Sequence, residues 1–70
     1  MSDEHLTHGI RELLKARHIP GLDIDEVRAE RGVIHVRGEA RSPFAKQTCY
    51  ECCRHVTGVR GVVDEVRLVG

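Results

Sequence analysis

The stretch that determines the fold is Gly32–Val59, which reads GVIHVRGEARSPFAKQTCYECCRHVTGV. Its first part, Val33–Ala40, alternates apolar and polar side chains, which is the pattern of a half-buried β-strand. Ser42 and Pro43 then predict a helix start, because serine is a favoured N-cap and proline suits the first helical position. Gly58 is expected to end this helix, since glycine adopts the left-handed conformation without a steric penalty. The stretch therefore predicts a strand, a helix and a return towards the sheet.

A first helix is predicted upstream, over residues 3–18. Its apolar positions recur at helical spacing and form one face, which consists of Leu6, Ile10, Leu13 and Leu14. Ser2 or Asp3 is expected to cap its N-terminus. The sequence Ile-Pro-Gly at residues 19–21 ends the helix, because proline and glycine interrupt regular structure.

A β-hairpin is predicted between residues 26–30 and Val33–Ala40, with Arg31-Gly32 as its loop. A two-residue loop with glycine second suits a type I′ turn, although arginine is less favourable than asparagine or aspartate at the first position. The pairing places Val27 opposite Val36 and Ala29 opposite Ile34 on one face, and Glu26 opposite Arg37 and Arg28 opposite His35 on the other. Ile24 falls on the wrong side of this alternation, so we expect a bulge or a strand start after it.

The remaining elements are a helix from Pro43 to about His55 and a last strand from Val62 to Val69. The buried face of this helix is expected to contain Ala45, Cys49, Cys52 and Val56, with Cys53 beside them. Val66 and Leu68 are expected to point inward from the last strand. Two amphipathic helices and three strands share one core only if both helices cover one sheet face. The predicted fold class is α+β in the order αββαβ, as one domain over residues 1–70, with a charged sheet face, including Arg67, left to solvent.

The composition excludes several classes of partner. The chain has 11 basic and 11 acidic residues, so its net charge favours neither nucleic acid nor an anionic membrane. One Phe, one Tyr and no Trp leave no aromatic platform on which bases could stack. No apolar run approaches membrane-spanning length. We therefore expect no nucleic-acid partner and no transmembrane segment.

The N-terminal sequence MSDEH has neither the basic region nor the apolar region of a secretory signal. Three cysteines within five residues are an odd number and not a disulfide framework. Both features favour a reducing compartment. We expect a cytoplasmic location for the chain as given, and a periplasmic or envelope location if it is cut from a longer exported protein.

Cys49, Cys52 and Cys53 have two interpretations. Their spacing is reminiscent of a metal or redox motif, but a structural zinc site needs four tetrahedral donors. The spacing also places Cys49 and Cys52 at the centre of the buried helix face, and free cysteine is among the most buried residue types. Core packing is favoured, because thiol chemistry needs exposed, activated thiolates. A metal or redox protein is kept as the least favoured hypothesis.

The histidines offer little support for a metal or catalytic site. His5 and His8 lie one helical turn apart and could share a metal weakly, but solvated surface histidine is the better interpretation. His35 is expected on the open sheet face as a solvent-facing residue. No serine or cysteine has an identifiable histidine partner, so nucleophilic catalysis has no support. We expect no catalytic residues, no metal and no cofactor.

Arg11, Lys15 and His18 form a basic stripe on the first helix, roughly opposite its apolar face. Such a stripe could meet anionic headgroups, although most basic stripes are simply solvated helix faces. These three residues are the lipid-contact candidates.

Phe44 and Tyr50, on the second helix, are expected to be partly exposed. They could anchor a partner or shield the rim of the core, and the rim is the favoured interpretation. They are the candidates for contact with a partner.

The chain resembles the BON domain, a small bacterial module named for osmotic-stress and nodulation proteins. The resemblance extends over roughly residues 3–69 and is carried by short structural signals whose order and spacing match together. These are the Gly-Val-x-x-Val-x-Gly pattern at Gly32, Val33, Val36 and Gly38, the small-residue helix after Ser42, the Gly58-Val59 step, and Val62, Val66 and Leu68.

The resemblance implies an αββαβ fold with a mixed three-stranded sheet and a non-enzymatic role in binding phospholipid or tethering proteins at membranes. The chain departs from the family pattern in having cysteines where alanine or leucine is usual. A protein-interaction domain, or one that self-associates through an edge strand or the open sheet face, is the alternative. We accordingly expect a monomer or a weak homo-oligomer.

Overall fold

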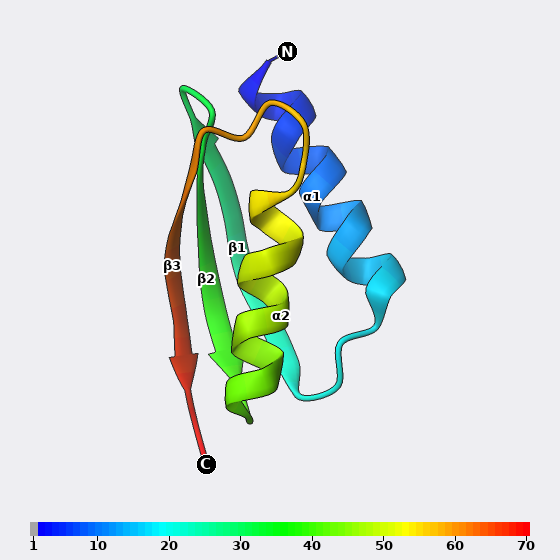
Figure 1. Ribbon diagram of the computed structural model, residues 1–70, viewed down its shortest axis with the longest axis vertical. Helices are drawn as coiled ribbons and strands as arrows, with labels where there is room; N and C mark the ends of the chain where they lie inside the picture. The colour runs from blue at the N-terminus through cyan, green and yellow to red at the C-terminus, as the bar shows by residue number, and fades with distance from the viewer. Residues whose placement is uncertain (1) are drawn as a thin grey trace.

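The computed structural model describes residues 2–70 and contains two helices and three strands in the order αββαβ (Figure 1). The elements are α1 (Asp3–Arg17), β1 (Leu22–Glu30), β2 (Val33–Ala40), α2 (Pro43–Arg54) and β3 (Gly61–Leu68). The α+β fold predicted from the sequence is therefore confirmed.

The three strands form one mixed sheet in the order β1-β2-β3. β1 pairs antiparallel with β2, and β3 pairs parallel with β2. A parallel pair requires a crossover connection, which α2 provides. Both helices cover the same face of the sheet, with α1 against β1 and α2 mainly against β2 and β3 (Figure 1). The other face carries charged side chains, including the exposed side chain of Arg67, as predicted.

The β1–β2 hairpin has the predicted register and turn. Its cross-strand pairs include Glu26–Arg37, Val27–Val36, Arg28–His35 and Ala29–Ile34. Arg31 and Gly32 have φ angles of 51° and 82°. A type I′ turn requires positive φ at both central residues, and the loop has this geometry. Gly32 adopts positive φ readily, whereas Arg31 is an unfavourable residue at its position.

β1 is longer than predicted, because it begins at Leu22 rather than at Glu26. The expected irregularity is a bulge, where the register shifts between Ile24 and Glu26. One extra residue in a strand reverses the phase of its alternation. Ile24 consequently pairs with Gly38 and packs against the core, on the same face as Val27.

Asp3 links α1 to the hairpin turn. Its carboxylate accepts hydrogen bonds from the backbone N–H groups of Arg31 (2.9 Å) and Gly32 (3.1 Å). The helix itself is capped by Ser2, whose hydroxyl accepts from the His5 N–H at 3.2 Å. Asp3 therefore holds α1 against the hairpin turn. The sequence allowed either Ser2 or Asp3 as the N-cap, and the structure shows that it is Ser2.

α2 begins as predicted, with the Ser42 hydroxyl accepting from the Ala45 N–H at 3.1 Å. The prediction that Gly58 ends this helix is wrong, because α2 ends at Arg54 with His55 as its right-handed cap. Gly58 has φ 97° within a turn closed by the Val59 N–H and the Val56 C=O at 3.1 Å. Glycine takes positive φ at the third position of such a turn, so Gly58 shapes the loop into β3.

The core lies between the helices and the sheet. Its fully or nearly fully buried members are Leu6, Ile10, Leu14, Val27, Ile34, Val36, Ala40, Ala45, Cys49, Cys52, Cys53 and Val66. The prediction that the three cysteines pack in the core is therefore confirmed. Leu68 was expected to point inward, but its side chain is 55% exposed, because it lies at the end of the last strand.

Candidate functional site

The cysteine cluster is buried and forms part of the core. All three thiols are free. The neighbouring Cys49 thiol and burial together raise the pKa of the Cys53 thiol, which therefore remains protonated at neutral pH. Within residues 2–70, no three side chains of His, Cys, Asp or Glu are grouped as metal ligands would be.

A concave surface lies between α1 and β1, here called the α1–β1 groove. It has a volume of about 650 Å³. Its walls are formed by Arg11, Leu14, Lys15, His18, Ile19, Leu22, Ile24, Asp25, Glu26 and Val27. The structure therefore brings all three predicted lipid-contact residues to one groove.

Arg11 and Lys15 lie one helical turn apart on α1, and both line the groove where this helix packs against β1. His18 follows the last helical residue and adopts the left-handed conformation, with φ 48°. This turn of the backbone carries the chain from α1 towards Ile19 and β1.

The two walls of the α1–β1 groove carry opposite charge. Arg11 and Lys15 are exposed on the α1 wall, and within residues 2–70 neither forms an ion pair. Asp25 and Glu26 are exposed at the bulge of β1 and border the groove from the sheet edge, although the pairing with Arg37 puts Glu26 on the open face of the sheet. The floor is apolar and includes Leu14, Ile19, Leu22, Ile24 and Val27. Such a groove suits a ligand with a charged head and an apolar body, and its lining contains neither serine nor cysteine.

Comparison with known protein families agrees with this architecture. The family model described as the BON domain matches residues 2–70. The chain belongs to the BON domain family. No curated protein matches the chain. No helix within residues 2–70 combines the length and the apolar character needed to cross a membrane.

The two aromatic candidates of this BON domain lie on different sides of α2. Phe44 is 73% exposed, as expected, and lines a second groove between α1 and α2, beside Leu13 and Arg17. Tyr50 is half-buried and does not line that groove, and the Arg54 guanidinium carbon lies 5.9 Å from its ring centroid. Phe44 and Tyr50 therefore do not form one shared contact surface for a partner.

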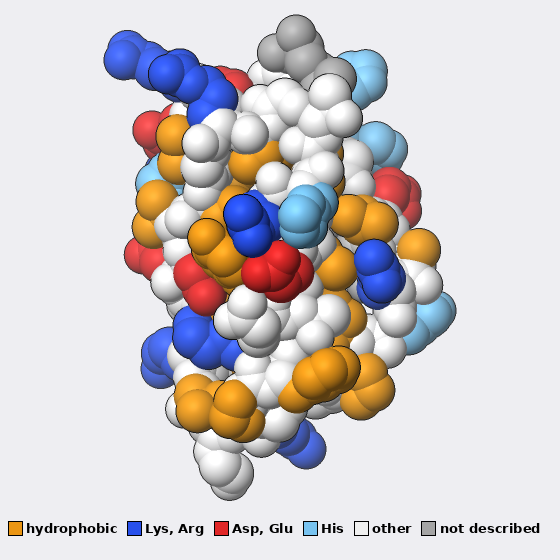
Figure 2. Space-filling view, in the orientation of Figure 1, with side chains coloured by type: hydrophobic (Ala, Val, Ile, Leu, Met, Phe, Trp, Pro, Cys, Tyr) orange, Lys and Arg blue, Asp and Glu red, His pale blue; other side chains and the backbone are white. Residues whose placement is uncertain are grey.

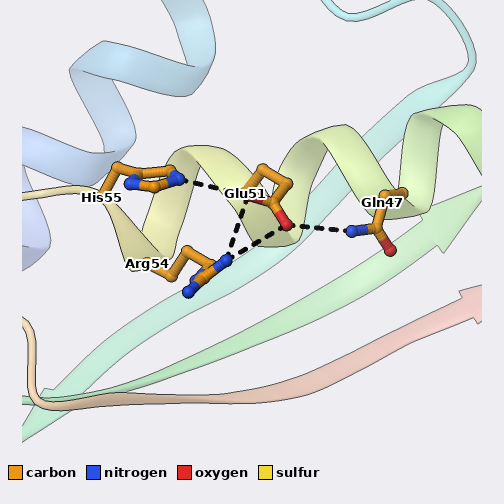
Figure 3. Close-up of polar contacts among 4 residues, drawn as sticks. All are labelled: Gln47, Glu51, Arg54 and His55. Carbon is orange, nitrogen blue, oxygen red and sulfur yellow. Dashed lines mark hydrogen bonds and ion pairs between the residues drawn. The ribbon is translucent and has the colours of Figure 1, made fainter.

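The Glu51 carboxylate contacts three polar side chains along α2 and at its C-terminal end (Figure 3). Its carboxylate accepts from the Gln47 amide at 3.0 Å and lies 3.4 Å from an Arg54 guanidinium nitrogen and 3.2 Å from His55 Nε2. These polar groups are therefore paired with one another along a single helix. The basic groups of α2 therefore offer less free charge to a ligand than Arg11 and Lys15 do.

The acidic wall and the floor of the α1–β1 groove were missed by reasoning from the sequence. Ile24 did give a signal, since it broke the alternation of β1. The bulge that restores its phase is also what places Asp25 at the edge of the groove. A bulge in an edge strand beside a helix is therefore the feature that would have indicated this site.

Proposed function

We propose that this BON domain is a non-catalytic binding module that contacts anionic phospholipid at the α1–β1 groove. The observation that carries the proposal is the convergence of Arg11, Lys15 and His18 on one apolar-floored groove. The family resemblance points in the same direction. Arginine and lysine suit a lipid phosphate, and the floor suits the apolar part of the lipid next to it.

The expected affinity is modest. A basic group near an anionic bilayer contributes about 1 kcal/mol, and the effect decreases with salt. Arg11 and Lys15 together therefore supply about 2 kcal/mol, which corresponds to roughly a 30-fold change in binding. Asp25 and Glu26 on the facing wall oppose the attraction to an anionic surface. Binding should accordingly be detected at low salt and weaken as salt is added.

The test is co-sedimentation with vesicles of phosphatidylcholine alone and of phosphatidylcholine with phosphatidylglycerol. The wild-type chain should bind the anionic vesicles at low salt and should bind the neutral vesicles much less. The double variant Arg11→Ala/Lys15→Ala should lose roughly 30-fold in binding. A matched control is Arg17→Ala/Arg37→Ala, which removes the same charge at exposed positions outside the α1–β1 groove.

Equal binding of both double variants would show that net charge, and not the groove, governs association. The absence of binding to either kind of vesicle would refute the phospholipid proposal. A protein partner would then be the remaining candidate for this binding module.

A further inference from the structure

Two arginines meet at the hairpin end of the open sheet face. Arg31 from the β1–β2 turn and Arg60 from the segment before β3 line one shallow hollow, here called the hairpin hollow. Its volume is about 540 Å³, and its other lining residues are Glu30, Val33 and His35. Lys and Arg side chains project together at the end of the molecule where the β1–β2 turn lies (Figures 1 and 2).

The backbone of Arg31 is held in the turn. Its φ of 51° lies in the left-handed region, where Asn, Asp or Gly costs less conformational free energy than Arg. The turn is nevertheless held, because the Asp3 carboxylate accepts from the N–H groups of Arg31 and Gly32. This clamp acts from α1, on the other side of the hairpin from the open face. The Arg31 guanidinium is thus carried on a fixed backbone at the edge of the hollow.

The backbone of Arg60 contacts the same turn. Its backbone N–H donates to the Gly32 C=O at 2.8 Å. Its Cγ and Cδ atoms lie 3.0 Å from the position that a Cβ on Gly32 would occupy. The stem of Arg60 therefore packs closely over Gly32, where an added side chain would crowd it. Arg31 and Arg60 are consequently held next to one another by a single glycine turn.

The charge balance of the hairpin hollow is positive. Glu30 is its one acidic lining residue, and this carboxylate already pairs with Arg28 at 2.8 Å. Within residues 2–70, neither Arg31 nor Arg60 forms an ion pair. Two exposed arginines therefore line one hollow, and its single carboxylate is already paired with another arginine.

We propose that the hairpin hollow binds a phosphate-class anion between Arg31 and Arg60. A guanidinium offers parallel N–H donors that match two oxygens of a phosphate. Two such groups match the charge and the tetrahedral shape of a phosphate dianion better than those of a single carboxylate. The half-buried His35 ring supplies a further polar group beside them. The hollow shares no lining residue with the α1–β1 groove, so this site does not depend on the phospholipid proposal.

The test is a titration of the ¹⁵N-labelled chain with inorganic phosphate at constant ionic strength, followed by amide chemical shifts. Saturable shifts are expected at Arg31, Gly32 and Arg60. The double variant Arg31→Asn/Arg60→Gln should bind at least about tenfold more weakly, because it loses both charge-assisted contacts. Asparagine tolerates the left-handed turn, and glutamine preserves much of the Arg60 stem. The control Arg37→Gln removes a charge from the same sheet face outside the hollow and should bind phosphate as the wild type does.

Two further arms identify the source of the phosphate. Tighter binding of glycerol phosphate than of inorganic phosphate would assign the site to a lipid headgroup or another phosphomonoester, and equal binding would assign it to phosphate itself. The variant Arg11→Ala/Lys15→Ala should retain phosphate binding whether or not it binds vesicles, which separates this site from the α1–β1 groove. Shifts that do not saturate, or that persist unchanged in Arg31→Asn/Arg60→Gln, would overturn the proposal.

Discussion

Lys46 on α2 and Asp64 on β3 lie 3.0 Å apart, and together they occupy both backbone polar groups of Val66. The Lys46 ammonium donates to the Val66 C=O, and the Asp64 carboxylate accepts from the Val66 N–H at 3.0 Å. The Val69 N–H donates to Ala40 of β2, so by alternation the groups of Val66 point to the outer edge of the sheet. This edge strand is therefore closed to an added strand at Val66.

The first prediction is that Lys46→Met opens the edge of β3. The substitution removes the donor to Val66 and leaves Asp64 without its partner, while methionine preserves an unbranched stem. We expect the free energy of unfolding to fall by about 1–3 kcal/mol, because the pair is only partly exposed and includes charged hydrogen bonds. Urea denaturation measures this loss. Sedimentation should also show a mass that rises with protein concentration, as strand pairing becomes possible.

Arg67→Ala, also on β3, is the control, because it breaks an exposed ion pair with Glu39 of β2 without freeing an edge group. This variant should lose less than about 1 kcal/mol and should not change its mass with concentration. If Lys46→Met stayed folded and kept a constant mass, the closure of the β3 edge would not depend on this pair.

The second prediction concerns the clamp between Asp3 and the hairpin turn. Asp3→Ala removes the acceptor of two backbone hydrogen bonds, so the free energy of unfolding should fall by about 1–2 kcal/mol. Asp3→Asn keeps one acceptor oxygen and should fall between the wild type and Asp3→Ala. Glu4→Gln removes the same charge from the first turn of α1 and controls for the interaction of acidic groups with the helix N-terminus. A loss as large in Glu4→Gln would mean that the helix terminus, and not the clamp, is responsible.

The sequence predicted those features that depend on near neighbours. The alternation of Val27, Ala29, Ile34 and Val36 gave the hairpin register, and Ser42-Pro43 gave the start of α2. The α1 stripe of Arg11, Lys15 and His18 was identified as a candidate site, but the groove beneath it was not. Its other wall comes from a strand whose bulge could be suspected only from Ile24.

Contacts between distant parts of the chain could not be predicted. The Asp3 carboxylate meets Gly32, which is 29 residues away, and Lys46 meets Asp64, which is 18 residues away. No local pattern marks either pair, because each depends on how α1 and α2 are placed against the sheet. Gly58 was assigned to the helix end for a similar reason, since a glycine with positive φ serves a helix cap and a loop turn equally well.

The third prediction contrasts two glycines. A Cβ on Gly9 would meet nothing within 4 Å, so Gly9→Ala should stabilise α1 by about 1 kcal/mol. A Cβ on Gly38 would overlap the backbone oxygen of Asp23, where β1 and β2 approach each other closely. Gly38→Ala should therefore cost about 3 kcal/mol or more, because the backbone must move. Urea denaturation of both variants measures the two effects, and equal stabilities would contradict the close approach at Gly38.

The fourth prediction concerns the reactivity of the buried thiols. Cys49 and Cys53 are fully buried, which keeps a reagent from both thiols. The raised pKa of Cys53 also keeps it protonated, whereas the Cys53 side chain lowers the pKa of Cys49, so Cys49 is protected by burial alone. A thiol reagent at pH 8 should therefore label these two residues far more slowly in the native chain than in urea. Cys52 is slightly exposed and should be labelled first. Rapid native labelling of all three would contradict their place in the core.

The last prediction concerns the acidic wall of the α1–β1 groove. If anionic phospholipid binds there, Asp25 and Glu26 repel the same headgroups that Arg11 and Lys15 attract. The double variant Asp25→Asn/Glu26→Gln removes this repulsion with little change in side-chain size. Its binding to phosphatidylglycerol vesicles should rise by roughly tenfold at low salt, and the gain should shrink as salt is added.

Co-sedimentation measures this gain, with Glu12→Gln/Glu65→Gln as the matched control. These two glutamates are exposed and lie outside the groove, so their replacement changes the net charge of the chain by the same amount. A gain confined to Asp25→Asn/Glu26→Gln would place the headgroup at the α1–β1 groove, because these two acidic residues border it. A similar gain in the control would instead show that the vesicle senses the net charge of the whole chain, and the groove would lose its role.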